Sequence, residues 1–381
     1  MTSSSLGRRA LLGGTAAGIA AAAIPATAGS ASATPTSLLR GLTSSLLGTP
    51  FRIDVHCHHI PDFYRLSLAE HGIVTAGGIP IPPWSPALAV GFMDEYGIAA
   101  QVVSISEPGV YYLPTAAERN DMARRINDWT RDTLLTTANP LLAKRFGAFA
   151  VLPLGDPNDP ADVTNACAEA VRAITVLGLD GVGLFSQYNG VYLGDPRLEP
   201  LMLTLQTLGA FTFVHPVTPA AYPDLGLPTF LYEFPFDTTR AAVNLSYHQV
   251  FTRYRGIRWL LAHAGGTLPF LAYRTSLLEL TTPIAQNLDL SAFDKQNFDY
   301  GRLFYDTALS PAPSAMMSVR EVTAVSHIMF ATDWPFSGPI FVVPGDPAPQ
   351  LGDSFSSTEL SQVLRANALD QMPRLKQRLG A

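Results

Sequence analysis

Short apolar runs alternate with amphipathic helical patterns along the chain from Phe51 onward. Each run is nearly continuous in apolar residues, which is typical of strands in a parallel sheet that helices cover. Eight runs are present, at residues 51–55, 100–105, 146–152, 181–185, 211–215, 257–263, 303–306 and 328–333. Eight strand–helix units in about 330 residues favour a closed (β/α)8 TIM barrel of the α/β class. A doubly wound open sheet is the alternative.

The first 33 residues differ in composition from the rest of the chain. Arg8 and Arg9 precede a run of small apolar residues over 10–24, and Ala31-Ser32-Ala33 resembles a cleavage site. The apolar run is too short to span a bilayer comfortably. We therefore interpret this segment as an export signal of the twin-arginine type, which predicts a periplasmic or extracellular protein without a stable membrane span. If the signal is not used, the protein stays in the cytoplasm.

Residues 34–49, rich in Ser, Thr, Leu and Gly, are expected to be a linker, and residues 50–381 a single barrel domain. Hydrophobic residues make up 47% of the chain and charged residues 15%, so the core can be large. The net charge is −6, and no basic run follows the signal, which argues against a nucleic-acid partner. Two cysteines are too few for a disulfide framework.

Metal-binding side chains follow several of the predicted strands. His56 and His58 end the first strand, His215 the fifth, His263 the sixth and Asp333 the eighth. Because active sites of such barrels lie at the carboxyl ends of the strands, we expect these side chains to converge. Three neutral imidazoles and one carboxylate suit a borderline divalent ion such as Zn²⁺.

The fourth strand decides the number of metal ions. A second ion needs a bridging lysine carbamate or glutamate, and residues 180–185 contain neither residue type. We therefore expect one ion per chain. Asp306 ends the seventh strand, where it either orients a neighbouring side chain or makes a loop hydrogen bond, and we favour the loop hydrogen bond.

Five motifs together resemble the amidohydrolase superfamily. They are Asp54-Val55-His56-Cys57-His58, Phe213-Val214-His215-Pro216, His263-Ala264-Gly265-Gly266, Phe304-Tyr305-Asp306-Thr307-Ala308-Leu309 and Thr332-Asp333-Trp334-Pro335-Phe336. Within the superfamily the chain is most similar to the branch of aminocarboxymuconate-semialdehyde decarboxylase and related non-oxidative decarboxylases. The resemblance extends from Phe51 to the C-terminal helix and keeps the order and spacing of the motifs.

The resemblance implies a barrel of the metal-dependent hydrolase type and a role for each motif residue. It implies Zn²⁺ on four ligands, which are His56, His58, His215 and Asp333. It implies that His263 is the catalytic histidine rather than a fixed ligand. Our own expectation is that Asp333, besides holding the ion, takes part in proton transfer. The resemblance also implies that Arg274 binds a substrate carboxylate, in that family often at the neighbouring subunit's site, which predicts a homodimer. Phe336 is expected to line the substrate pocket.

We therefore expect a mononuclear zinc-dependent decarboxylase, a carboxy-lyase, that acts on an unsaturated or aromatic carboxylic acid. A hydrolase of a lactone, ester or amide on the same barrel is the alternative, and an inactive exported metal-binding protein is a third. The Pro- and Gly-rich loop expected over residues 77–86 lacks the second arginine of the aminocarboxymuconate enzymes, and Val217 replaces an aromatic residue. These departures concern the substrate, which the sequence leaves open.

Overall fold

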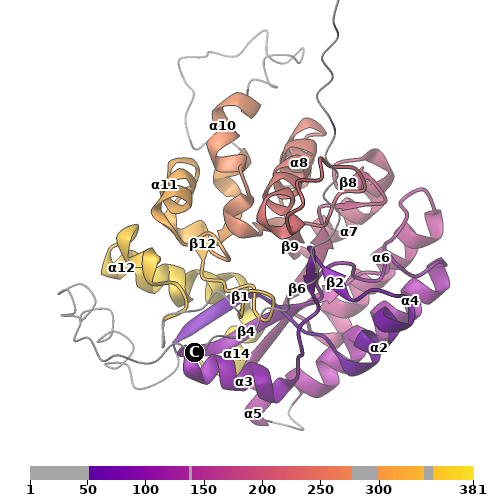
Figure 1. The fold of residues 1–381 in the computed structure, drawn as a ribbon, viewed down its shortest axis with the longest axis horizontal. Helices are drawn as coiled ribbons and strands as arrows, with labels where there is room; N and C mark the ends of the chain where they lie inside the picture. Colours follow the sequence, from indigo (N-terminus) through magenta and orange to yellow (C-terminus); the bar gives the residue numbers. More distant parts are fainter. Residues whose placement is uncertain (1–50, 137–139, 277–298, 339–345) are drawn as a thin grey trace, which may run out of the picture.

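The computed structural model describes residues 51–136, 140–276, 299–338 and 346–381. Eight parallel strands form one sheet that curls into a nearly closed barrel, with helices around its outside (Figure 1). In order around the barrel the strands are β1 (Arg52–His58), β4 (Ile98–Ser104), β5 (Phe146–Val151), β6 (Gly181–Phe185), β9 (Phe211–His215), β10 (Arg258–Leu261), β11 (Phe304–Asp306) and β12 (Ile328–Met329). The prediction of a TIM barrel is confirmed.

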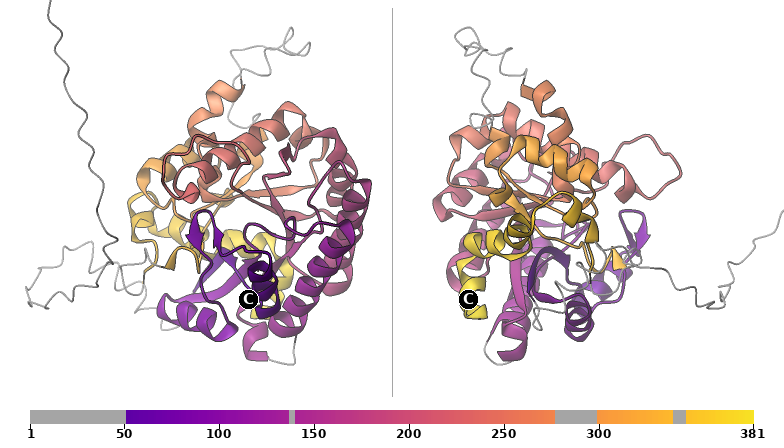
Figure 2. Two further views of the ribbon diagram at one scale, coloured as in Figure 1. Left: turned by 45° about the vertical axis from the view of Figure 1, so that its right-hand side comes forward. Right: turned by 90° about the vertical axis from the view of Figure 1, so that its left-hand side faces the viewer.

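The helices alternate with the strands in sequence and cover the outer face of the barrel (Figure 2). They are α2 (Asp62–Glu70), α3 (Pro86–Glu95), α4 (Ala116–Thr130), α5 (Pro140–Ala143), α6 (Pro160–Arg172), α7 (Glu199–Leu208), α8 (Glu233–Tyr247), α9 (Val250–Arg253), α10 (Leu268–Ser276), α11 (Pro313–Val322), α12 (Ser357–Ser361), α13 (Asn367–Gln371) and α14 (Pro373–Leu379). None of the helices in the described ranges is long and apolar enough to cross a membrane.

Two small hairpins lie in the loops between strands and helices. The pair β2 (Thr75–Ala76) and β3 (Ile79–Pro80) precedes α3, and the pair β7 (Gln187–Tyr188) and β8 (Val191–Tyr192) follows β6. The sequence indicated only a loop in the first of these segments.

Sequence-local signals set the ends of several helices. Thr115 and Glu118 form a reciprocal capping box at the start of α4, and Ser85 caps α3 ahead of Pro86. Gly209 ends α7 in the left-handed conformation, which a glycine adopts without steric cost. The first two signals set where a helix begins, and Gly209 sets where α7 ends.

The barrel interior is an apolar core that two C-terminal helices close from below. Ile53, Phe149 and Phe211 from the strands pack with Leu369 of α13 and Met372, which precedes α14. The amino-terminal end of the barrel is thereby filled with side chains. A second apolar cluster fills the space between sheet and helices.

The barrel closes between β1 and the segment after β12. The His58 amide donates to the Trp334 carbonyl at 2.7 Å, and the Asp333 amide donates to the His56 carbonyl at 2.7 Å. The predicted eighth strand reaches residue 333, but the regular ladder ends at Met329. The two hydrogen bonds nevertheless hold Asp333 beside β1.

Other boundaries differ from the expectations at element ends. The predicted helix over 238–254 begins at Glu233 and breaks near Gln249, whose φ is 58°. The end of the predicted helix over 268–280, the export signal of residues 1–33 and the linker of residues 34–49 lie outside the described residues.

Candidate metal centre

The two histidines of β1 point to one place. The Nε2 atoms of His56 and His58 are 3.2 Å apart, and both side chains are fully buried. The register of β1 against β4 shifts between Asp54 and Cys57. Cys57 turns away, and its thiol donates to the Val102 carbonyl. The alternation expected of a strand therefore holds at these positions.

His215 at the end of β9 and Asp333 after β12 complete a cluster with the two histidines. One potential ligand atom from each of the four residues lies within 4.8 Å of the others. Asp333 Oδ1 is 3.3 Å from His56 Nε2 and 3.0 Å from His58 Nε2. Ligand atoms around a tetrahedral Zn²⁺ lie roughly 3.3 Å apart, given metal–ligand bonds of about 2.0–2.2 Å. The donor set therefore fits a divalent ion, and a metal-binding site of His and Asp residues is present.

Burial and neighbouring charges give the ligands different pKa values. Burial lowers the pKa of His58, and it lowers that of His215 well below the usual value, so both imidazoles are neutral near pH 7. Burial also disfavours charge on His56, but the carboxylates of Asp306 and Asp333 raise its pKa to about 10. Burial would raise the pKa of Asp333, but the imidazoles around it, His56 foremost, hold it well below its usual range. In the metal-free cluster His56 therefore carries a proton. A divalent cation bound there would replace the positive charge of that proton beside the carboxylates.

Asp306 orients the cluster from beneath. Its Oδ2 is 2.8 Å from His56 Nδ1, and its Oδ1 accepts from the amides of His263 at 2.8 Å and Ala308 at 3.0 Å. A proton on His56 Nδ1 directs Nε2 to the centre of the cluster, a common arrangement behind metal-bound histidines. The preference for a loop hydrogen bond alone was wrong, because Asp306 makes that bond and also orients His56.

Asp54 joins three segments of the site. It accepts from the Thr332 hydroxyl at 2.6 Å, from the Gln101 amide group at 3.2 Å and from the His56 amide at 3.2 Å. Burial raises the pKa of Asp54 to about 6 in spite of these bonds. Asp54 thereby ties β1 to β4 and to the loop that carries Asp333.

His263 lies beside the cluster rather than within it. Its Nε2 is 3.3 Å from Asp333 Oδ2, and its buried Nδ1 has no partner among the described residues. The backbone from His263 to Gly266 stays at positive φ for four residues. A Cβ on Gly266 would collide with the Pro235 carbonyl, so glycine is required in this turn. The turn aims His263 at the site although β10 already ends at Leu261.

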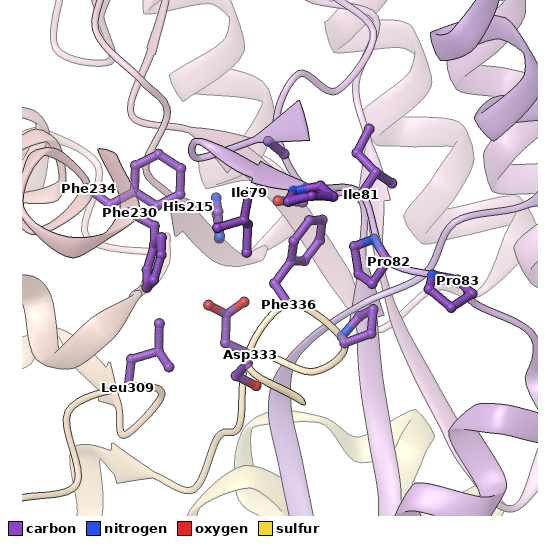
Figure 3. A pocket seen from close by; sticks show the side chains of 15 residues that line it. Ile79, Ile81, Pro82, Pro83, His215, Phe230, Phe234, Leu309, Asp333 and Phe336 are labelled. Carbon is purple, nitrogen blue, oxygen red and sulfur yellow. The ribbon is translucent and has the colours of Figure 1, made fainter. Parts of the chain in front are cut away.

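A cavity of about 500 Å³ opens onto His215 and Asp333 (Figure 3). Its wall is mainly apolar and comes from the β2–β3 hairpin, the start of α8 and loops rather than from the barrel strands. The larger apolar side chains are Ile79, Ile81, Phe230, Phe234, Leu309 and Phe336. Phe336 was predicted to line a pocket, and the structure places it in this wall, with its ring centroid 5.5 Å from that of His58.

The other wall residues were not predicted from the sequence. A Gly77-Gly78 pair between short apolar runs is a hairpin signal that could have been recognised. No local signal marks Phe230 or Leu309, because their role depends on where their loops fold.

Arg274 is not brought to this site. It lies on α10, is exposed to solvent and is absent from the cavity lining. Its predicted contact with a substrate carboxylate stays a prediction.

A family model described as Amidohydrolase matches residues 53–370. The 6-methylsalicylic acid decarboxylase of Penicillium expansum is 30% identical over 339 residues, which cover 85% of this chain and 97% of that protein. The fold is also similar to the crystal structure of 5-carboxyvanillate decarboxylase from Sphingomonas paucimobilis, with a TM-score of 0.69 at 22% identity. The superposition covers 85% of this chain and 99% of that one. A dihydroxybenzoic acid decarboxylase from a Polaromonas species, with bound manganese and 2-nitroresorcinol, has a TM-score of 0.64 at 21% identity, with coverage of 85% and 97%.

Proposed function

Because the chain belongs to the amidohydrolase family, we propose that it is a metal-dependent decarboxylase, a carboxy-lyase, of aromatic carboxylic acids. The observation that carries this proposal is an apolar cavity that ends on a buried cluster of three histidines and one aspartate. A cavity of about 500 Å³ accommodates a substituted benzene ring. The similarity to decarboxylases such as the Penicillium enzyme supports the loss of CO₂ as the reaction.

We propose one divalent ion per chain, held by the cluster of His56, His58, His215 and Asp333. The imidazole-rich set suits Zn²⁺, as predicted from the sequence. Mn²⁺ is the alternative, because the Polaromonas dihydroxybenzoic acid decarboxylase, which has a similar fold, contains bound manganese. When bound, such an ion stabilises negative charge on a substrate oxygen by Lewis-acid chemistry.

In the proposed reaction the ring carbon loses its carboxyl group as CO₂ and gains one proton. His263 donates that proton from Nε2, the atom that lies 3.3 Å from Asp333 Oδ2. The Asp333 carboxylate orients the imidazole, and a solvent proton restores His263 after the product has left. The apolar wall excludes bulk water and so strengthens these electrostatic interactions.

We further propose that the protein is a homodimer in which Arg274 serves the partner's site. The helix α10 exposes Phe270 and Tyr273, whose side chains are 83% and 73% accessible. Large exposed aromatic side chains on one helix are typical of an interface. Arg274 lies next to Tyr273 on the same helix and is exposed to solvent, and we propose that its guanidinium binds the substrate carboxylate in the partner subunit.

Assays of CO₂ release from substituted salicylates test the reaction. The metal-loaded protein is expected to release CO₂ in proportion to phenol formation, and chelation is expected to abolish both. Acid release from lactones, esters or amides, with no CO₂ from any aromatic acid, would support the hydrolase alternative instead. Elemental analysis that finds two ions per chain would contradict the mononuclear site.

The location of the protein is a separate proposal, namely export through the twin-arginine pair Arg8 and Arg9. Replacement of both by lysine is expected to retain the protein in the cytoplasm. Undiminished export of this double variant would contradict the assignment.

A further inference from the structure

We propose that Ile79 of the β2–β3 hairpin and Leu309 select aromatic acids that carry an apolar ring substituent over those that carry a polar one. This inference rests on the proposed function and narrows its substrate class. Both side chains line the cavity, and in Figure 3 Ile79 lies above the Asp333 carboxylate and Leu309 to its left. They come from separate segments, the β2–β3 hairpin between α2 and α3 and the loop after β11.

The hairpin is fixed in place by two anchors. The Phe230 amide donates to the Gly77 carbonyl at 3.1 Å, and Arg65 of α2 donates to the carbonyls of Ile81 and Pro82. A Cβ on Gly77 would lie 3.0 Å from the Phe234 ring, so the turn packs closely against the opposite wall. Gly77 and Gly78 both have positive φ, as a tight two-residue hairpin requires. Ile79 is therefore held at the cavity by a rigid support.

Leu309 is held in an unusual conformation. Its φ is 53°, a left-handed value that is rare for a branched apolar residue. The preceding turn is fixed by Asp306, which accepts from the Ala308 amide. A sparsely populated backbone conformation that places a side chain in a binding cavity is common at functional sites.

The cavity offers few partners to a polar substituent. Among the described residues, the polar side chains that line it besides His215 and Asp333 are Ser106 and Ser337. The Ser337 hydroxyl already donates to the Thr332 carbonyl at 2.6 Å. A hydroxyl group on the ring that faces Ile79 or Leu309 would therefore lose its water without gaining a hydrogen bond. A methyl group of similar size at the same position fills the space without this cost.

The test uses pairs of salicylates that carry a methyl or a hydroxyl group at the same free ring position. For the position that faces the wall, we expect kcat/KM to favour the methyl compound by roughly tenfold to a hundredfold. Intrinsic reactivity also differs within each pair, so the decisive quantity is the change in this ratio between variants.

Ile79→Thr and Ile79→Val provide variants of nearly equal shape that differ by one hydroxyl group. Ile79→Thr is expected to lower the methyl-to-hydroxyl ratio by about tenfold relative to Ile79→Val, because the new hydroxyl supplies a hydrogen-bond partner. The control is Val74→Thr, which also exchanges a valine for a threonine but at an exposed side chain just before the hairpin. It should leave the methyl-to-hydroxyl ratio unchanged. Equal ratios for the two Ile79 variants at every ring position would overturn the inference.

Binding measurements test this inference independently of the decarboxylation reaction. The dissociation constants of 3-methylphenol and 3-hydroxyphenol for the metal-loaded protein can be measured by calorimetry without turnover. Tighter binding of 3-methylphenol that Ile79→Thr reverses supports the apolar selection even if no acid is decarboxylated, in which case only the proposed reaction fails. Turnover of salicylates with no preference in either measurement would overturn the selection alone.

Discussion

The metal centre and the cavity wall meet at Asp333, yet they are built in different ways. The metal centre uses polar side chains at strand ends, held by buried carboxylates such as Asp306 and Asp54. The wall uses apolar side chains from a hairpin and from loops, such as Ile79 and Phe230. Polar bonds fix the direction of each ligand atom, whereas van der Waals contacts fix only the shape of the space above.

This difference separates what each region controls. Changes in the metal centre should alter metal binding and catalytic rate, because the buried carboxylates and imidazoles depend on one another for charge balance. Changes in the wall should alter the choice of substrate and leave the metal in place.

The largest effect is expected from His56→Ala. The variant removes one ligand atom and leaves Asp306 without its imidazole partner. Metal content, measured by elemental analysis, and decarboxylase activity should both fall to background. Phe230→Leu is the matched change in the wall and should retain the metal. Equal metal content in wild type and His56→Ala would place the ion elsewhere.

His263→Asn should separate catalysis from metal binding. His263 lies beside the cluster, so the ion should stay bound while kcat falls by roughly 10²–10⁴, the range of general acid–base catalysis. Steady-state kinetics and metal analysis on the same sample measure both quantities. Loss of the ion together with activity would make His263 a ligand rather than a proton donor.

Arg274→Ala should raise KM by roughly tenfold to a hundredfold, as expected for loss of a charge-assisted hydrogen bond of about 1.5–3 kcal/mol. Metal content should not change, because Arg274 is not one of the four residues of the metal centre. Mixing this variant with His263→Asn should restore some activity if the arginine acts across a dimer. An unchanged KM for every carboxylate tested would remove Arg274 from the site.

Asp306→Asn should weaken metal affinity by about 10- to 100-fold, the usual effect of losing a carboxylate behind a metal-bound histidine. Excess metal should restore most of the activity, since the ligands themselves remain. Competition with a chelating dye measures the affinity. A variant with unaltered affinity would reduce Asp306 to the loop hydrogen bond that the sequence suggested.

The last prediction concerns pH and needs no substitution. The pKa of His56 is raised to about 10 in the metal-free protein, so its imidazole is protonated below that pH. Metal binding must displace this proton, and affinity should therefore rise about tenfold per pH unit from neutral pH toward 10. Calorimetry at about pH 8 in two buffers of different ionisation enthalpy should detect about one proton released. No proton release would show that His56 is already neutral.

The sequence by itself determined the barrel and most of its metal centre. Near-continuous apolar strands with intervening helices leave few folds, and in a parallel barrel every strand ends at the same rim. His56, His58, His215 and Asp333 therefore had to lie near one another once the strands were located. The spacing of residues along the strands carried this information, because strand geometry is regular.

Only the tertiary structure decided the supports of the metal centre and the wall of the cavity. The contact between Asp306 and His56 joins residues 250 positions apart, and no local pattern encodes which acceptor faces Nδ1. The wall arises where the β2–β3 hairpin packs against the loop that carries Phe230. Loop conformations depend on packing between distant segments, so the side chains proposed to choose the substrate could be identified only after the chain was folded.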